Sequence, residues 1–412
     1  MNRMSALDGV RVLDFSKVLA GPMCAQYLGD LGADVIKMEP MEHGDDTRRY
    51  PPFMQNGDDS DGTIFLSVNR NKRSFALDLK TEGGRQACHK LAMTADIVIE
   101  SYGPGVAERL GIGHEALMAA NPRLIHCSIS GYGNTGPMKE GKGYDAVLQA
   151  FSGMLSITGE PGGKPARSPF SPVDQGTGLY ALAGILAALY ERTRTGRGAR
   201  VEASLFDTSV GFLGYILQGF WKTGREPQPP GSAHDSLCPY EVFDTADRPV
   251  LLGVANDVLW RKFCAVAGVP ALAEDERFRT NASRVAHRVE TVATVSALLA
   301  RRSREDWMAA LSAAGVPVSP VHSLGEMVAH PHTSEVAMVQ RYSHPVYGEL
   351  NTVAMPVKLD GQRSRTDRPA PLLGQHTHDI LRELGYDDAA IGALAEAGAI
   401  NLARTGQELA TR

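Results

Sequence analysis

The sequence predicts an α/β fold, in which a large domain built on a mostly parallel sheet is followed by a smaller α/β domain. Two observations lead to this class. The first third of the chain alternates short apolar runs with helix-like segments, which is the pattern of βαβ units. Farther along, a proline-rich stretch at residues 225–231 (REPQPPG) reads as a linker to a second group of strands and helices.

In the first part, strands are predicted from short apolar runs and helices from the longer segments between them. The run VRVLDF at 10–15, for example, is followed by a Gly-Pro turn and then by a helix-like segment. The expected strands are 10–15, 34–38, 65–68, 74–79, 96–100, 124–130 and 200–204. The expected helices are 23–32, 83–94, 106–110, 144–154 and 176–192, and the rest of the glycine-rich stretch 131–163 is expected to form loops.

The second part repeats these signals over a shorter length. Strands are expected at 240–243 and 250–254, and helices at 260–267 and 289–301. The tail contains a strand after residue 348 and a proline-rich turn at 369–371. A terminal helix should begin near Thr377, which is a suitable N-cap residue.

Composition excludes several classes of function. The chain has 412 residues with a net charge of -5, which argues against a nucleic-acid binder that relies on phosphate contacts. Its five cysteines are scattered and form no C-x-x-C pair, so reduced thiols fit better than a disulfide framework. No apolar signal core is present near the N-terminus, and the most apolar stretch is too short to span a bilayer. We therefore expect a cytoplasmic protein that binds neither membranes nor nucleic acid.

Two familiar motifs are set aside. GYGNTG at 131–136 matches the glycine pattern of dinucleotide-binding proteins, but the residues that follow it cannot open a helix cleanly. A turn-rich loop is the better interpretation. His234, His376 and His378 have no partners at metal-ligand spacing, so no metal site is predicted.

A basic loop, NRNKR at 69–73, lies among the predicted strands, with Lys37 and Lys80 nearby in sequence. Charge runs of this kind usually form solvated turns. Lysine and arginine at the edge of a sheet also suit the phosphates of a nucleotide-like ligand. The residues alone do not decide between these two interpretations.

Asp174, in the segment PVDQG at 172–176, comes just before an apolar helix rich in small residues. An aspartate in that place is ordinarily an N-cap. The same helix end also stabilises a reacting carboxylate, and free backbone N–H groups there can hold an oxyanion. From the physical chemistry alone, the cap is the better interpretation.

The order of short motifs along the chain changes this balance. The chain resembles the class III CoA-transferases, the CaiB/BaiF or formyl-CoA transferase-like family, over nearly its whole length. No single motif is specific, but together and in this order they are. The motifs are LDGVRVLD at 7–14, AGP at 20–22, GADVIKMEP at 32–40, NKRS at 71–74, ESYGPG at 100–105, GYG at 131–133, GYD at 143–145, SG at 152–153, GILAAL at 184–189, TGRG at 195–198 and PLLGQHT at 371–377.

The resemblance implies that Asp174 is the covalent nucleophile. It would attack a donor thioester to give an acyl-aspartyl anhydride and free CoA thiolate. The acceptor carboxylate would then take the acyl group, CoA would form a thioester on Asp174, and a new anhydride would be resolved into the product thioester. CoA and acyl-CoA are substrates in this scheme, and no cofactor is bound permanently.

The same resemblance, together with the basic loop, gives a set of expected CoA-binding residues. They are Val18, Leu19, Ala20, Lys37, Asn71, Lys72, Arg73, Leu77, Lys80, Ser101, Tyr102, Gly103, Arg109, Lys142, Tyr144 and Asp145. The implied architecture is a Rossmann-like large domain made from both ends of the chain, 1–224 and 331–412, with a small domain at 225–330. Two such chains would form an interlocked homodimer.

Within the family, this chain looks like the branch that uses succinyl-CoA with dicarboxylic acids. The formyl-CoA branch has glutamine where this chain has Leu19, whereas GSAH at 231–234 and PYEVF at 239–243 resemble the dicarboxylate branch. A cation is needed for the distal carboxylate of the acceptor, and Arg48, Arg73 and His234 are the candidates.

Two alternatives remain open. The α-methylacyl-CoA racemases of the same family use a histidine that falls at Tyr144 here, and a tyrosine with its pKa of about 10 is a poor base at neutral pH. A protein that binds CoA without catalysis is the other alternative. It would keep its function without Asp174.

Overall fold

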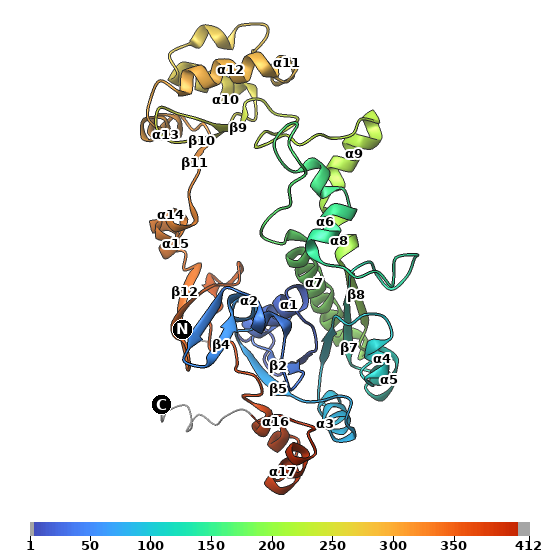
Figure 1. The fold of residues 1–412 in the computed structure, drawn as a ribbon. Helices are drawn as coiled ribbons and strands as arrows, with labels where there is room; N and C mark the ends of the chain where they lie inside the picture. The colour runs from blue at the N-terminus through green and yellow to red at the C-terminus, as the bar shows by residue number, and fades with distance from the viewer. Residues whose placement is uncertain (1–3, 403–412) are drawn as a thin grey trace. The chain divides into compact units, whose positions relative to one another are not determined.

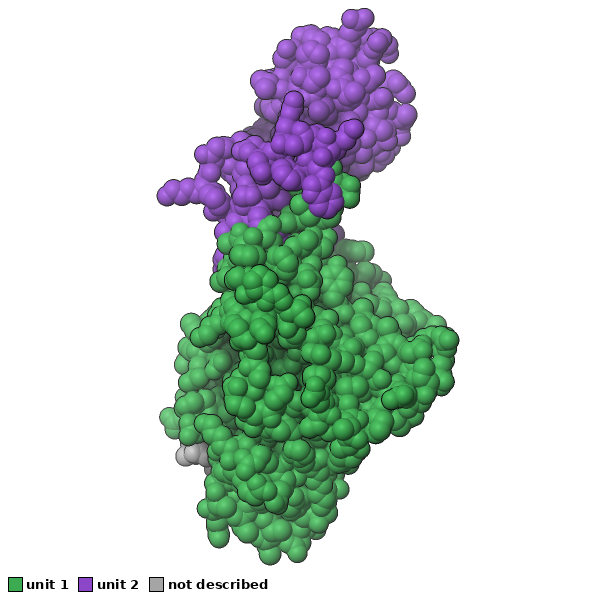
Figure 2. All heavy atoms as spheres, turned by 90° about the vertical axis from the view of Figure 1, so that its right-hand side faces the viewer, with its two compact units in different colours: residues 1–152, 168–218, 331–412 green, residues 153–167, 219–330 purple. Residues whose placement is uncertain are grey.

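A computed structural model of the chain describes residues 4–402. The chain forms two compact units, which Figure 2 shows in different colours. Unit 1 contains residues 1–152, 168–218 and 331–412, and unit 2 contains residues 153–167 and 219–330. Residues 153–167 thus belong to unit 2 although they precede the proline-rich linker. The predicted domain bounds, 1–224 with 331–412 and 225–330, stay a prediction.

Unit 1 is built on a six-stranded sheet in which every strand pair is parallel, which confirms the predicted α/β class (Figure 1). Its order is β5-β2-β1-β6-β7-β8, which is the 3-2-1-4-5-6 order of doubly wound dinucleotide-binding folds. The strands are β1 (Arg11–Asp14), β2 (Asp34–Glu39), β5 (Lys72–Ala76), β6 (Ile97–Glu100), β7 (Ile125–Ser130) and β8 (Arg200–Ser204). The strand order reverses between β1 and β6.

Helices connect these strands, and one of them packs closely on another. The connecting helices are α1 (Ala20–Asp30), α2 (Thr63–Val68), α3 (Glu82–Ala92), α4 (Val106–Arg109), α5 (His114–Ala120), α6 (Asp145–Phe151) and α7 (Pro172–Thr195), and α8 (Leu205–Phe212) and α9 (Gly214–Thr223) follow β8. α1 and α7 lie side by side (Figure 1). They approach closely because Gly178 has no side chain: a Cβ there would lie 2.5 Å from the Ala20 carbonyl oxygen.

The end of the chain returns to this sheet. Ile380 and Leu381 of α16 (Thr377–Glu383) and Ile391 of α17 (Asp388–Glu396) belong to the same apolar core as Leu13 and Ile36. Backbone hydrogen bonds from His376 to Ser74 and from Asn401 to Ala76 attach the tail to β5. The C-terminal segment therefore helps to complete the core that supports the sheet.

Three local predictions need correction. Residues 65–68, predicted as a strand, form the end of α2, in which Phe65, Leu66 and Val68 are buried. The third strand begins at Lys72 rather than at residue 74. Thr377 is not an N-cap: it lies in the first turn of α16, and its hydroxyl accepts a hydrogen bond from the Ala76 N–H.

Unit 2 has its own core around Trp260, Phe263 and Trp307. Its three-stranded antiparallel sheet has the order β11-β10-β9, with β9 (Tyr240–Phe243), β10 (Val250–Gly253) and β11 (Val318–Pro320). Its helices are α10 (Asp257–Val266), α11 (Asn281–Ala286), α12 (Arg288–Leu299), α13 (Arg304–Ala313) and α14 (Leu324–Ala329).

The remaining elements of unit 1 are short. They are η1 (Asp46–Arg49), the hairpin β3 (Phe53–Asn56) and β4 (Asp59–Gly62), α15 (Pro331–Glu335), the hairpin β12 (Val339–His344) and β13 (Gly348–Val353), and the pair β14 (Lys358–Leu359) and β15 (Gln362–Arg363). Among residues 4–402, no helix is both long enough and apolar enough to cross a bilayer.

The contact between α1 and α7 gives a first prediction. Gly178→Ala should lower the free energy of unfolding by about 1–3 kcal/mol, because the new Cβ would overlap the Ala20 carbonyl. The matched control is Gly211→Ala in α8, where nothing lies within 4 Å of the new Cβ. It should be stabilising by ~0.5–1 kcal/mol. Denaturant unfolding measures both variants, and equal effects would contradict the close approach.

Candidate active site

Ligands of doubly wound sheets bind beyond the carboxyl ends of the strands, where the strand order reverses. In unit 1 the segments that follow β1, β2, β5 and β6 meet at this edge. They enclose a cavity of about 300 Å³. Its walls are Phe15, Lys17, Met38, Glu39, Pro40, Met41, Glu42, His43, Leu77, Asp78, Leu79, Lys80, Tyr102 and Leu110. Three of the predicted CoA-binding residues, Leu77, Lys80 and Tyr102, are therefore brought together in one pocket.

The loop after β1 is held in an unusual conformation. Val18 has φ = 69°, a left-handed value that a β-branched residue rarely adopts. Three successive N–H groups of this loop donate to side chains: Ser16 to Asp14 (3.0 Å), Lys17 to Ser101 Oγ (3.0 Å) and Val18 to Asp45 (3.4 Å). The next residues, Leu19 and Ala20, begin α1, and no side chain caps this helix.

Asp174 lies at N3, in the first turn of α7, rather than before the helix. The residue at the N-cap position is Ser171, which has φ = 51° and caps the helix with no side-chain hydrogen bond. Asp145 of α6 supplies the missing cap. Its Oδ2 accepts hydrogen bonds from the N–H groups of Val173 (2.8 Å) and Asp174 (3.1 Å). The prediction that Asp174 itself could cap the helix is wrong, since Asp145 occupies that role.

This arrangement leaves the Asp174 carboxylate free. Within residues 4–402 we find no hydrogen bond or ion pair to it. Burial, and then the neighbouring Asp145 carboxylate, raise the pKa of Asp174 to about 7. A carboxylate that no donor or cation stabilises retains its basicity, which is what a nucleophile requires.

A network inside α6 fixes Asp145 in turn. Gln149, one helical turn later, donates from Nε2 to Asp145 Oδ1 (2.5 Å). The Gln149 amide also bonds to both backbone groups of Ser168, just ahead of α7. Asp145 and Gln149 are both buried. The role of Gln149 could not be predicted from the sequence, where the only signal is its spacing of four residues from Asp145.

The N-terminus of α7 has no spare donor for an oxyanion, contrary to the expectation from the sequence. Pro172 has no N–H, the next two N–H groups bond to Asp145, and the Gln175 N–H bonds to the Ser171 carbonyl (3.1 Å). By contrast, the N–H groups of Leu19 and Ala20 have no partner within the described residues. Gly178 brings α7 against this end of α1, so the free donors belong to the neighbouring helix.

The glycine motif serves close backbone packing. Gly131 lies against Gly143, where a Cβ on Gly143 would be 2.3 Å from the Gly131 Cα. This contact joins the end of β7 to the residues just before α6. It positions Tyr144 and Asp145, and the stretch between the two glycines is a loop with short turns, as predicted.

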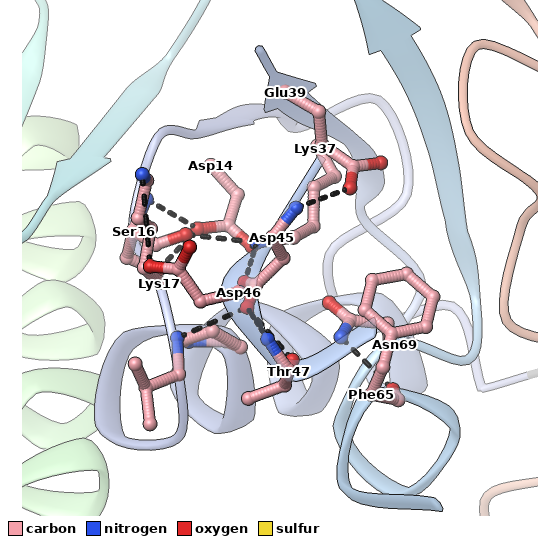
Figure 3. A network of polar contacts seen from close by, with 12 residues as sticks. Asp14, Ser16, Lys17, Lys37, Glu39, Asp45, Asp46, Thr47, Phe65 and Asn69 are labelled. Atoms are coloured by element: carbon pink, nitrogen blue, oxygen red, sulfur yellow. Dashed lines mark hydrogen bonds and ion pairs between the residues drawn. The ribbon is translucent and has the colours of Figure 1, made fainter. Parts of the chain in front are cut away.

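Lys37 and Lys72, both expected to bind CoA, are fully buried (Figure 3 shows Lys37). Lys37 Nζ bonds to the Ser16 carbonyl (2.8 Å) and forms ion pairs with Asp45 (2.9 Å) and Asp14 (3.9 Å). Burial alone would lower the pKa of Lys37, but these carboxylates raise it above its ordinary value. Burial lowers the pKa of Lys72 to about 8.

The three donors of Lys72 are also occupied, by Asp14, the Pro22 carbonyl and Asn69, each at 2.8 Å. A lysine ammonium has three donors. Lys72 therefore has no donor left for a phosphate, and Lys37 is completely buried among the oxygens of Ser16, Asp45 and Asp14. The structure therefore corrects the expectation of direct CoA contact and makes both lysines supports of the β1 loop and of α1.

Asn71 and Arg73 likewise have internal partners. Arg73 pairs with Asp34 and Glu383 at 2.6 Å each, and Asn71 bonds to Asp30 and to backbone groups of the C-terminal segment. The basic loop is thus neither a solvated turn nor an anion site.

Arg48, a candidate for binding the acceptor, is buried. It bonds to both oxygens of Glu39, to Asp61 and to the Pro371 carbonyl. The structure corrects the expectation that Arg48 or Arg73 is available to the acceptor.

Other expected residues are accessible. Lys80, Arg109 and Lys142 are exposed, and none has a side-chain ion pair within the part of the chain that the structure describes. Tyr144 precedes α6 and is 61% exposed, and Gly103 is exposed beside Ser101 and Tyr102. His234 belongs to unit 2, where its Nδ1 accepts a hydrogen bond from the Ser236 N–H. Across residues 4–402 no cluster of His, Cys, Asp or Glu could hold a metal ion.

Comparison with known proteins identifies the family to which the chain is similar. Residues 7–377 match the family described as CoA-transferase family III. The human succinyl-CoA:glutarate CoA-transferase is 37% identical over 403 residues, which cover 97% of this chain and 91% of the relative. The acetyl-CoA:oxalate CoA-transferase of Acetobacter aceti is 38% identical over 384 residues, 93% of this chain and 96% of the relative.

A solved structure has the same fold. The crystal structure of a CaiB/BaiF family protein from Brucella suis superposes with a TM-score of 0.81 at 35% identity, covering 92% of this chain and 99% of that one. The likeness extends over both units rather than over the parallel sheet alone. The chain belongs to family III of the CoA-transferases.

Proposed function

We propose that this CoA-transferase moves CoA from succinyl-CoA to a small dicarboxylic acid through covalent intermediates on Asp174. The observation that carries the proposal is the state of that carboxylate. It is half-buried, it has no bonding partner within residues 4–402, and burial and Asp145 raise its pKa to about 7. A structural carboxylate would be expected to bond to the helix end beside it, and here Asp145 makes those bonds instead.

The reaction proceeds through four balanced exchanges. Asp174 attacks the donor thioester, the C–S bond breaks, and CoA leaves as its thiolate while an acyl-aspartyl anhydride forms. The thiolate attacks the aspartyl carbonyl, which releases the donor acid and leaves CoA as a thioester on Asp174. This step replaces the expected transfer of the acyl group to the acceptor, because that transfer would leave Asp174 as a carboxylate with which the thiolate cannot form a thioester. The acceptor carboxylate attacks this thioester and again frees the thiolate. Attack of the thiolate on the acceptor carbonyl gives the product thioester and regenerates Asp174.

Each tetrahedral intermediate in this sequence carries a negative oxygen. We assign the N–H groups of Leu19 and Ala20 as its donors, because those of the first turn of α7 are occupied. Asp145 contributes through its charge: acylation neutralises Asp174, and the repulsion between the two carboxylates is then relieved. The covalent state is favoured relative to free Asp174 by that relief.

CoA would be held by the cavity at the end of the sheet and by the exposed cations near it. The walls formed by Leu77, Leu79 and Tyr102 offer apolar surface for a flat ring, and Lys80 offers charge for a phosphate. Arg109 and Lys142 are further exposed cations. Val18, Leu19 and Ala20 would face the thioester, and Ser101 supports them through the Lys17 N–H.

The relatives support a dicarboxylate acceptor, since glutarate and oxalate are both dicarboxylates. Succinyl-CoA as donor rests on the first of them. Of the three candidates for the distal carboxylate, Arg48 and Arg73 have their donors occupied, which leaves His234. Because His234 Nδ1 accepts a hydrogen bond, its ring would serve as a neutral Nε2–H donor rather than as a cation. A racemase would need a base at Tyr144, which is an exposed phenol with no acidic partner in the described residues, so this alternative is disfavoured.

We also propose that the protein works in the cytoplasm as an interlocked homodimer. Support comes from large aromatic side chains that a single chain leaves exposed. Five of these side chains are between 53% and 74% exposed: Phe170 just before α7, Tyr180 and Tyr190 of α7, and Tyr215 and Trp221 of α9. Aromatic residues are enriched in subunit interfaces.

Loss of the nucleophile should abolish transfer. With succinyl-CoA or acetyl-CoA as donor and a panel of mono- and dicarboxylic acids, the wild type should produce new dicarboxyl-CoA thioesters. Asp174→Ala and Asp174→Asn should lower kcat by about three orders of magnitude or more. Mass spectrometry of the thioesters measures this. Undiminished transfer by either variant would exclude the mechanism, and exchange of the α-proton of a branched acyl-CoA would favour the racemase.

The pKa of Asp174 predicts a pH dependence. Only the ionised carboxylate attacks, so the single-turnover rate of CoA release from donor thioester should rise with pH around about 7. Asp145→Asn removes the like charge and should move the midpoint to lower pH. Rapid-quench measurements between pH 5 and 9 test this, and an unchanged midpoint in Asp145→Asn would contradict the coupling.

The same pKa predicts a cost in stability. The pKa of Asp174 is higher in the folded protein than in the unfolded chain, so ionisation of this group favours the unfolded chain. The free energy of unfolding therefore falls as the pH rises from about 4 to about 7, and it falls no further on this account above that window. Asp174→Asn should therefore be stabilising by about 1–3 kcal/mol at pH 8 and nearly neutral at pH 4. Urea unfolding at both pH values gives the two numbers. A variant that is less stable than the wild type at pH 8 would contradict the assignment.

A further inference from the structure

The loop after β1 is strained, and the strain has an identifiable restraint. A left-handed backbone on a β-branched residue is strained and persists only where the surroundings impose it. Val18 is such a residue, at the position just before the two unpartnered N–H groups. Its own N–H is the only backbone donor of the loop that bonds to a side chain from the turn at residues 44–47.

Buried charged residues hold that turn in place (Figure 3). Asp45, at the N-cap of η1, accepts hydrogen bonds from the Thr47 N–H (3.0 Å) and hydroxyl (2.7 Å) with the same oxygen that receives Val18. Its other oxygen pairs with Lys37, which also bonds to the Ser16 carbonyl. Asp45 and Lys37 are both almost completely buried.

A second tie joins the same two segments. Lys17 Nζ lies 3.9 Å from an oxygen of Asp46, so two consecutive residues of the loop contact two consecutive residues of the turn. The turn directly follows Pro40, Met41, Glu42 and His43, which line the cavity at the end of the sheet. The restraint on Val18 is thus continuous with a wall of the proposed CoA pocket.

We propose that Asp45, anchored by Lys37, is a positioning residue that holds Val18 in its left-handed conformation and thereby fixes the N–H groups of Leu19 and Ala20 for catalysis. The inference deepens the proposed function and rests on it, since those N–H groups are the donors assigned to the oxyanion. Asp45 itself touches no reacting atom. Its effect reaches the reaction through the backbone of residues 18–20.

The kinetic test compares Asp45→Asn with Thr47→Val. Thr47→Val removes a buried hydrogen bond from the same turn without changing the bond to Val18, so it reports the cost of loosening the turn alone. Asp45→Asn should lower kcat by about tenfold to a hundredfold, as expected for displaced oxyanion donors, with a smaller change in KM for acyl-CoA. Thr47→Val should leave kcat within about threefold of the wild type.

Rescue separates positioning from a general structural role. In the Asp45→Asn background, Val18→Gly should recover most of the lost kcat, because glycine adopts the left-handed conformation without a restraint. Val18→Ala, which keeps a Cβ, should not. Equal kcat values for the two double variants, or a kcat unaffected by Asp45→Asn, would overturn the proposal.

A measurement without substrate makes the result independent of the reaction. With Asp45 present, Val18→Gly should have a higher Tm than Val18→Ala, because only alanine bears the strain. In Asp45→Asn that difference should shrink, since the loop relaxes in both. An equal Tm difference between Val18→Gly and Val18→Ala with and without Asp45→Asn would contradict the proposed restraint.

If Asp45→Asn does not fold, the two Val18 variants in the otherwise unchanged protein decide: an equal Tm would overturn the strain. If the wild type transfers CoA to none of the acids tested, the proposed function is refuted. The unfolding data would still test the restraint on Val18.

Discussion

The two hydrogen bonds from the first turn of α7 to Asp145 determine the chemistry available at this site. A helix N-terminus attracts a carboxylate, and the nearest one in sequence is Asp174. Because Asp145 already occupies that position, the half-buried Asp174 carboxylate has no donor or cation among residues 4–402. The helix thus begins next to two carboxylates, of which one is bonded and the other is available to attack.

The neighbouring helix α1 completes the arrangement. Gly178 allows α1 and α7 to touch, and this contact places the unpartnered N–H groups at the start of α1 beside the helix that carries Asp174. The loop ahead of α1 is strained, and buried charges from β1, β2 and η1 hold it. Buried ion pairs contribute little net stability in general. At this edge of the sheet the buried ion pairs instead fix the geometry of the loop ahead of α1.

Much of the fold could be predicted from the sequence, because parallel strands such as 10–15 and 124–130 read as apolar runs whatever surrounds them. Residues 65–68 could not be assigned, since four apolar residues in a short segment fit a strand and a helix equally well. The roles of Lys37, Lys72, Arg48 and Arg73 were also beyond reach of the sequence. A cation that pairs with a buried carboxylate and one that awaits a phosphate look the same until the distant partner, such as Glu383 for Arg73, is known.

Asp174 shows the limit most clearly, because the sequence pattern alone favoured a cap and only the resemblance pointed to a nucleophile. The central claim, that the acceptor's oxygen passes through Asp174, has a direct test. Turnover with a dicarboxylic acid labelled with heavy oxygen, followed by digestion and mass spectrometry, locates the label in the protein. Our account predicts that the peptide containing Asp174 gains one or two heavy oxygen atoms and that no other peptide does. An unlabelled Asp174 peptide after many turnovers would contradict it.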